Sequence, residues 1–177
     1  MVSDETLMLQ FQAGLRESFD ELFARYSAPL YAFFRRRLSS KEQAEDLTQE
    51  TWTAVLRGVV RYQPRALFRT YLYGIALKLL AAEHRRNSRA KSDLGVTAPV
   101  IPAAQDSTQW VREALYKLDA TEREIIMLRE YEQLSYCEIA ALLHIPVNTV
   151  RSRLFRARLT FKRLLEPDSG ATAAQGR

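Results

Sequence analysis

Thiol and imidazole groups are scarce in this sequence. Its 177 residues include one cysteine, Cys137, and two histidines, His84 and His144. A single cysteine excludes an internal disulfide, and three scattered ligands do not make the cluster that a structural zinc site needs. We therefore expect no metal site and a reducing, cytoplasmic location. Cys137 is expected to be a partly buried thiol, and both histidines to be ordinary surface or cap residues.

Long apolar runs and catalytic motifs are lacking as well. The N-terminus opens with Ser3, Asp4 and Glu5 instead of a basic patch before an apolar run, and no stretch approaches the roughly 18 apolar residues of a membrane span. We expect neither export nor a membrane span. The sequence contains no glycine-rich phosphate loop and no nucleophile with a partnered histidine. It therefore predicts no catalytic residues, no cofactor and no enzyme activity.

Strand-like alternation of polar and apolar residues is also missing, and helical spacing takes its place. One apolar face covers residues 19–38, with Pro29 inside it, where a kink or a short break is expected. A serine and a glutamine with capping-box spacing predict a second helix over residues 41–57. A third helical face covers residues 68–80. The chain is therefore predicted to be all-α.

Apolar residues and positive charge are what the sequence has in quantity. Hydrophobic residues make up 47% of the chain, the formal net charge is +5, and the sequence pI is about 9.5. This number of hydrophobic residues suffices for two small cores. The net positive charge favours an anionic partner such as nucleic acid. Because the apolar period stops in a stretch with linker composition, we expect two small helical domains joined by a flexible linker, and a disordered tail. Their predicted bounds are 1–88 for the first domain, 89–107 for the linker, 108–166 for the second domain and 167–177 for the tail.

A helix-turn-helix is the most informative motif. Ser135 and Glu138 have capping-box spacing before a short helix that stops at His144, and a new helix begins at Val147, directly after Pro146. Histidine is tolerated in such a turn because it is among the residues enriched at positive φ. One side of the new helix is apolar and packs, while the other is polar and can contact DNA.

Positive charge is concentrated on this second helix. Between residues 151 and 163 the sequence has six cations and no acid, which matches a phosphate backbone. Asn148, Thr149 and Ser152 lie at the start of the helix, the part that enters the major groove in such motifs. The pattern predicts a DNA-reading helix.

Two parts of the chain resemble the sigma-70 family of bacterial transcription initiation factors. The stretch from Leu118 to Arg158 is similar to conserved region four of that family. The segments Ala44-Glu-Asp-Leu-Thr-Gln-Glu-Thr-Trp52 and Thr70-Tyr-Leu-Tyr-Gly-Ile-Ala76 are similar to two signatures of region two. Because a short connector separates the two regions, the arrangement resembles the extracytoplasmic-function (ECF) group. The resemblance implies a sigma factor that binds core RNA polymerase and directs promoter-specific initiation.

The resemblance also implies a polymerase-binding face and a minus-thirty-five binding face. Core polymerase would bind the helix bearing Asp46, Gln49 and Glu50, and residues 39–56 carry four acids against one lysine. An acidic face within a basic protein favours a protein partner over DNA. The residues expected to bind the minus-thirty-five element are Asn148, Thr149, Arg151, Ser152, Arg153, Arg156 and Arg158.

A third implied surface binds and opens the minus-ten element. Residues 57–91 carry nine cations against Glu83 alone, with aromatic residues interleaved, which suits phosphates and unstacked bases. The loop over residues 62–69 would hold a flipped base. Phe68 and Tyr71 also lie on the packing face, so a core role is favoured for them, while Tyr62 and Tyr73 are expected at the surface. The residues expected to bind this element are Arg61, Tyr62, Arg65, Arg69, Tyr73, Lys78, Arg85 and Arg86.

Partners and rival functions follow from these surfaces. The expected partners are bacterial core RNA polymerase, promoter DNA and an anti-sigma factor, and the free chain is expected to be a monomer. An alternative is a stand-alone helix-turn-helix regulator that binds operator DNA without polymerase, usually as a dimer on symmetric half-sites. The acidic face on the first domain argues against that alternative.

Overall fold

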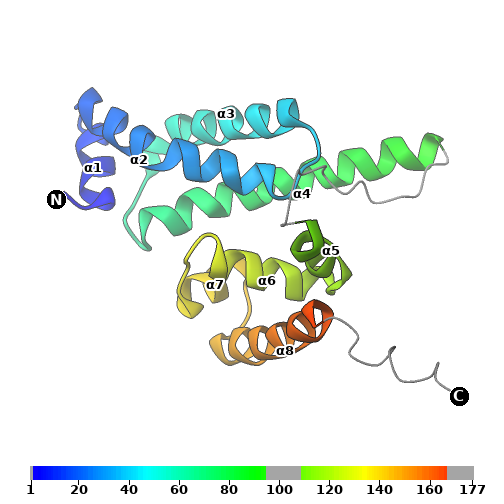
Figure 1. Cartoon of the computed structure of the whole chain (residues 1–177). Helices are drawn as coiled ribbons and strands as arrows, with labels where there is room; N and C mark the ends of the chain where they lie inside the picture. Colours follow the sequence, from blue (N-terminus) through cyan, green and yellow to red (C-terminus); the bar gives the residue numbers. More distant parts are fainter. Residues whose placement is uncertain (1, 95–108, 167–177) are drawn as a thin grey trace, which may run out of the picture. The chain divides into compact units, whose positions relative to one another are not determined.

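The computed structural model describes residues 2–94 and 109–166, and every regular element in these stretches is helical (Figure 1). The chain divides into two compact units, residues 1–102 and 103–177. The first unit contains α1 (Asp4–Gln12), α2 (Arg16–Arg35), α3 (Lys41–Gly58), the short 310 helix η1 (Val59–Arg61) and α4 (Phe68–Leu94). The second unit contains α5 (Gln109–Lys117), α6 (Ala120–Glu130), α7 (Tyr136–Leu143) and α8 (Val147–Leu165). The predicted all-α fold class is confirmed.

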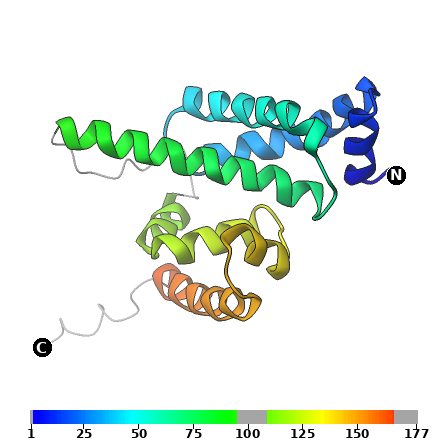
Figure 2. The same cartoon turned by 180° about the vertical axis from the view of Figure 1, so that it is seen from behind.

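The first unit is a bundle of α2, α3 and α4 with α1 across one end. Helix α3 packs against α2 and α4, while α1 contacts α2, α4 and η1 at the end where α2 and α4 begin (Figures 1 and 2). The bundle encloses large apolar side chains with no exposed surface, among them Leu22, Leu30, Phe33, Phe34, Phe68 and Leu72. Burying side chains of this size is the main stabilising contribution to such a bundle.

Helix α2 is continuous through Pro29, so of the expected kink or short break, the break is absent. Proline deprives the carbonyl of Arg25 of its helical partner. Leu22 on one side of Pro29 and Leu30 and Phe33 on the other are fully buried. Packing on both sides of the proline therefore offsets the lost hydrogen bond.

Helix α3 begins as predicted, with Ser40 as its N-cap. The Ser40 hydroxyl accepts a hydrogen bond from the backbone N–H of Gln43 at 3.1 Å. The Gln43 side chain does not complete the box, because its amide donates to a carboxylate oxygen of Glu83 on α4 at 3.0 Å. The start of α3 is thus linked to α4 within the same unit.

In the second unit α8 packs against α5, α6 and α7. Its core contains fully buried side chains from these helices and the turn before α7, among them Ile125, Leu128, Leu134, Ile139, Val150 and Leu154. The predicted capping box of α7 is complete, since the Ser135 hydroxyl accepts from the Glu138 N–H and the Glu138 carboxylate accepts from the Ser135 N–H. The short helix α7 is therefore fixed at its first turn.

The turn between α7 and α8 has the predicted form. His144 lies in the left-handed region with φ 53°, and Pro146 in extended conformation is the N-cap of α8. The N–H of Ile145 donates to the Ala140 carbonyl at 3.1 Å, which satisfies a carbonyl at the end of α7. The helix-turn-helix predicted from the sequence is present.

Several details differ from the sequence-based expectations. Helix α1 was not predicted, and α4 continues to Leu94, into the stretch expected to be linker. The rest of that stretch and the expected tail lie outside the described residues, so the linker and tail remain predictions. The expectation of a partly buried Cys137 is wrong, because its thiol is exposed on the side of α7 opposite the buried Ile139.

Candidate nucleic-acid interface

The three residues predicted to bind polymerase lie together on the outer side of α3. Asp46, Gln49 and Glu50 are exposed, while Leu47 and Thr51 on the opposite side are buried. The hydrogen bond that Ser40 donates to Glu42 holds the pKa of that carboxyl below its usual value, and Glu42 adds an acid to the first turn of α3. The outer side of α3 can attract a positively charged partner.

The cations predicted to bind the minus-ten element come from two places. Arg61 and Arg65 are exposed in the segment between α3 and α4, and Arg69 is half-buried in the first turn of α4. The remaining cations, Lys78, Arg85 and Arg86, are exposed further along α4.

Glu83 offsets one cation of this basic surface. Its side chain is buried, where it accepts the hydrogen bond from Gln43 and lies 3.4 Å from a guanidinium nitrogen of Arg86. Residues 57–91 carry nine cations against this one acid, so the surface remains positively charged. This charge suits a phosphate backbone.

The expectation that Tyr62 and Tyr73 are at the surface is wrong. Tyr62 is 6% exposed and Tyr73 is 4% exposed. The Tyr62 ring centroid lies 5.3 Å from that of Tyr71, and the Tyr73 centroid lies 5.3 Å from that of Phe33 on α2. Because α4 contacts α1, α2 and α3, its buried arc is wider than one apolar stripe and includes Tyr73.

Phe68 is fully buried, as expected, and Tyr71 is half-buried. Burial raises the pKa of Tyr71 above its usual value. The Tyr71 hydroxyl closes on the end of α3 so tightly that a Cβ at Gly58 would lie 2.6 Å from it. A side chain at position 58 would therefore require the Tyr71 ring to shift.

The recognition side of α8 has the predicted polar and basic character. Asn148, Arg151, Ser152 and Arg156 are exposed, while Thr149 and Arg153 are half-buried. The opposite side is buried at Val150, Leu154 and Ala157. The helix thus presents amides, hydroxyls and cations to solvent, the groups that contact base edges and phosphates.

Arg158 is the exception among the predicted contacts of α8. Its guanidinium pairs with the Glu130 carboxylate at the end of α6, and this hydrogen bond raises the pKa of Arg158. Half of each side chain remains exposed. The pair joins α8 to α6, so the structure assigns Arg158 to holding the helix as well as to the basic surface.

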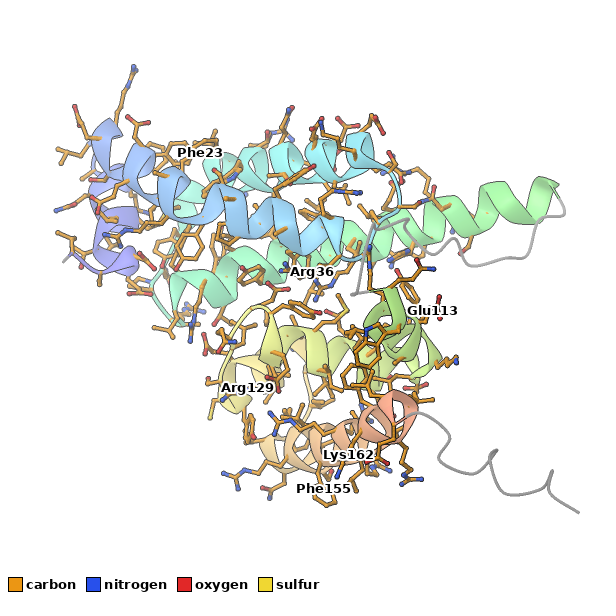
Figure 3. All side chains as sticks on the ribbon, in the orientation of Figure 1. Phe23, Arg36, Glu113, Arg129, Phe155 and Lys162 are labelled. Atoms are coloured by element: carbon orange, nitrogen blue, oxygen red, sulfur yellow. The ribbon has the colours of Figure 1, made fainter. Side chains whose placement is uncertain are left out.

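An exposed aromatic ring on α8 was missed in the sequence. Phe155 is 65% exposed, and Figure 3 shows its side chain pointing away from the other helices of its unit. It follows the exposed Ser152 by three residues, and this helical spacing is the signal that places it on the polar side. Leu159, one turn later, is also exposed. An apolar side chain here can contact the methyl group of thymine.

Comparison with known proteins accounts for both units. The family described as Sigma-70 region 2 matches residues 22–90, and the family described as Sigma-70, region 4 matches residues 108–161. RNA polymerase sigma factor CarQ of Myxococcus xanthus is 33% identical over 165 residues, which cover 89% of this chain and 95% of CarQ. The chain belongs to the sigma-70 family.

Two further relatives extend the comparison, and the first is named as a factor of the ECF group, to which this sigma factor belongs. The ECF RNA polymerase sigma-E factor of Haemophilus influenzae is 27% identical over 184 residues, with 94% of this sigma factor and 97% of that one covered. The sigma factor RpoE in its complex with the anti-sigma factor NepR from Bartonella quintana is similar with a TM-score of 0.75 at 26% identity, over 86% of this chain and 99% of that one. The similarity extends over both units.

As a sigma factor, the protein directs RNA polymerase to promoters and is not an enzyme. Matches to both regions disfavour the stand-alone regulator, which has no use for a polymerase-binding region. Among the described helices, none is both long and apolar enough to cross a membrane.

Proposed function

We propose that this sigma factor divides promoter recognition among three surfaces. Asp46, Gln49 and Glu50 form the polymerase face, which binds core RNA polymerase. The minus-ten surface consists of the exposed or half-buried cations Arg61, Arg65, Arg69, Lys78, Arg85 and Arg86. The minus-thirty-five surface is the recognition side of α8, with Asn148, Thr149, Arg151, Ser152, Arg153, Arg156 and, through its exposed half, Arg158.

The observation that carries the proposal is the separation of charge among these surfaces. The outer side of α3 bears acids, whereas the exposed cations of the α3–α4 segment, α4 and α8 lie on other elements. Complementary charge steers an acidic face toward a basic protein surface and basic faces toward DNA. A helix that only binds operator DNA has no need of the acidic face.

On α8 the two kinds of contact have different tasks. Asn148 and Ser152 lie at the N-terminal part, where a recognition helix meets base edges, and their amide and hydroxyl groups can read them. Arg153 and Arg156 bind phosphates and fix the register of the helix in the groove. Phe155 adds an apolar contact on the same side.

On the minus-ten surface the arginines and Lys78 bind phosphates of the separated strand. Tyr62 and Tyr73 are packed inside the unit, so we assign them to the support of this surface instead of to base stacking. We assign the contact with an unpaired base to the exposed Arg65 and Leu67 of the α3–α4 segment.

Two further assignments rest on family similarity. The similar sigma factor from Bartonella quintana was solved with an anti-sigma factor, and we propose that a partner of the same kind binds this chain. Core RNA polymerase and promoters are in the bacterial cytoplasm, so we assign the protein to that compartment. We expect the free chain to be a monomer.

Binding to purified bacterial core RNA polymerase tests the polymerase face. We expect the labelled chain to bind tightly by fluorescence anisotropy, and the variant with Asp46→Ala, Gln49→Ala and Glu50→Ala to bind at least about tenfold more weakly, because several central contacts are removed together. The control, Glu17→Ala with Asp20→Ala, removes two exposed acids from α2 and should bind like the parent chain.

The same reconstituted holoenzyme supplies a promoter. Run-off transcription from templates with a randomised upstream region, followed by sequencing of the transcripts, yields a selected template for later experiments. If the folded parent chain binds no polymerase, or if the triple variant binds as tightly as the parent, the assignment of the polymerase face is wrong.

A further inference from the structure

We propose that α1 is a positioning element for the minus-ten surface, because two of its side chains fix both ends of the loop formed by residues 62–67. Gln12 holds the end of this loop that follows η1, and Glu5 holds the end at which α4 begins. The inference rests on the proposed role of this loop in minus-ten binding. It adds residues that do not themselves contact DNA.

Gln12 acts as a remote cap for the end of α3 and η1. Its side-chain nitrogen Nε2 donates to three backbone carbonyl oxygens, those of Val59 at 2.7 Å, Val60 at 3.1 Å and Tyr62 at 3.2 Å. Carbonyls at a helix end have no partner within the helix and need one from elsewhere. The Gln12 amide has two N–H hydrogens for these three carbonyl oxygens, so one hydrogen is shared between two of them. The chain is thereby fixed at the point where it leaves η1.

Glu5 acts on the other end of the loop. Its carboxylate oxygen Oε1 accepts a hydrogen bond from the backbone N–H of Phe68 at 2.7 Å. Phe68 is the first residue of α4, and the first N–H groups of a helix lack intrahelical acceptors. A carboxylate at this place also interacts favourably with the helix dipole. Glu5 therefore performs the task of an N-cap from a different helix.

Between these two anchors the loop is exposed. Gln63, Pro64, Arg65, Ala66 and Leu67 all lie at the surface, and Leu67 is 49% exposed. Within the loop the N–H of Arg65 donates to the carbonyl of Gln63 at 2.8 Å. The buried rings of Tyr62 and Phe68 flank the loop with their centroids 6.5 Å apart. The ends are fixed while the tip remains available to DNA.

Helix α1 is itself held firmly enough to serve as an anchor. Leu7 and Met8 are buried, and Asp4 pairs with Arg25 and accepts a hydrogen bond from the hydroxyl of Tyr26 on α2. A separate bond joins Ser18 on α2 to the side chain of Gln10 at 3.0 Å. Residues 4–12 precede the stretch 22–90 that matches Sigma-70 region 2.

A loop fixed at both ends loses less conformational entropy when it binds a flexible strand. Releasing the anchors should therefore weaken binding of unpaired minus-ten DNA without affecting α3. We expect the double variant Glu5→Ala, Gln12→Ala to bind single-stranded DNA about tenfold more weakly. A factor of this size corresponds to the loss of one to two hydrogen-bonded anchors. The probe is a fluorescent oligonucleotide with the non-template minus-ten sequence of the selected template, added to reconstituted holoenzyme.

Three variants distinguish positioning from a general loss of structure. Glu5→Gln retains an oxygen that accepts from Phe68 and should recover most of the binding lost in Glu5→Ala. Thr6→Ala changes an exposed side chain of the same helix that bonds to Ser3 and not to the loop, and it should bind the oligonucleotide like the parent. Affinity for core polymerase should be the same for the parent and the double variant. Hydrogen exchange at the Phe68 amide should be faster in Glu5→Ala than in Glu5→Gln.

The comparison with Arg61→Ala, Arg65→Ala separates this inference from the function on which it rests. If that arginine variant loses oligonucleotide binding while the α1 double variant keeps it, α1 does not position the loop. If the arginine variant also keeps full binding, the loop is not part of the minus-ten surface, and both proposals are overturned.

Discussion

Tyr62 combines burial with a polar atom that has no hydrogen-bond partner among the described residues. Its side chain is 6% exposed, and its hydroxyl oxygen is buried without a partner. An unsatisfied buried hydroxyl costs stability. We expect Tyr62→Phe to raise the free energy of unfolding of the first unit by about 1 kcal/mol near neutral pH, measured by urea denaturation of the full chain.

This gain should increase at alkaline pH. Burial raises the pKa of Tyr62 to about 12, above the ordinary value of 10. As pH rises from 10 toward 12, the unfolded tyrosine loses its proton while the folded one keeps it, so the parent chain loses stability that Tyr62→Phe retains. A gain that stays constant from pH 8 to pH 11.5 would show that the hydroxyl is accessible to water.

Tyr62→Ala, which leaves a cavity, should instead destabilise the unit by about 3 kcal/mol.

The same tyrosine shows where sequence reasoning ends at this scale. The helical spacing of Phe68 and Leu72 correctly predicted buried residues, because it depends on one helix alone. The burial of Tyr62 and Tyr73 depends on rings from other elements, Tyr71 for the first and Phe33 for the second. Spacing within one segment contains no information about those partners.

At the level of elements, the turn between α7 and α8 sets the direction of the recognition helix. His144 adopts φ 53°, a conformation that costs a residue with a Cβ about 1 kcal/mol and glycine almost nothing. We expect His144→Gly to stabilise α7 and α8 by up to about 1 kcal/mol, and His144→Val to destabilise them. Native-state hydrogen exchange of amides in α7 and α8 of the full chain measures both effects.

The opposite signs make this prediction specific to the turn. Both variants remove the imidazole. A contribution from its charge or packing would therefore change the stability of both variants in the same direction. Equal exchange rates for glycine and valine at this position would show that the turn is not held in the left-handed conformation.

The elements that the sequence predicted well are those with a strong local signal. Ser40 and Ser135 were recognised as caps, and His144 was expected to be tolerated in a turn with positive φ. Helix α1 was missed because it is short and buries few side chains, Leu7 and Met8 among them. A cap signal was present, since the Ser3 hydroxyl accepts from the Thr6 N–H at 3.2 Å. The hydrogen bonds from α1 to the distant loop could not be predicted, because they require the tertiary arrangement.

For the whole molecule, the net charge of +5 conceals an uneven distribution. The polymerase face on α3 is acidic, and the two proposed DNA surfaces are basic. A uniformly basic protein of the same net charge would also attract DNA to its polymerase face, and the two partners would compete there. Separate faces let one chain bind polymerase and promoter together, which is what a sigma factor must do.

This distribution predicts how salt affects promoter binding. Each phosphate contact that is lost reduces the slope of log affinity against log salt concentration by about 0.9. For holoenzyme on the selected template, Arg153→Ala with Arg156→Ala should therefore reduce the magnitude of the slope by about 1.8 and weaken binding to all sequences alike. Asn148→Ala should leave the slope unchanged and relax the base preference in the minus-thirty-five element. The control, Arg16→Ala with Lys117→Ala, removes two exposed cations outside the proposed surfaces. If this control reduces the slope as much as the α8 variant does, net charge and not the recognition side of α8 governs DNA binding.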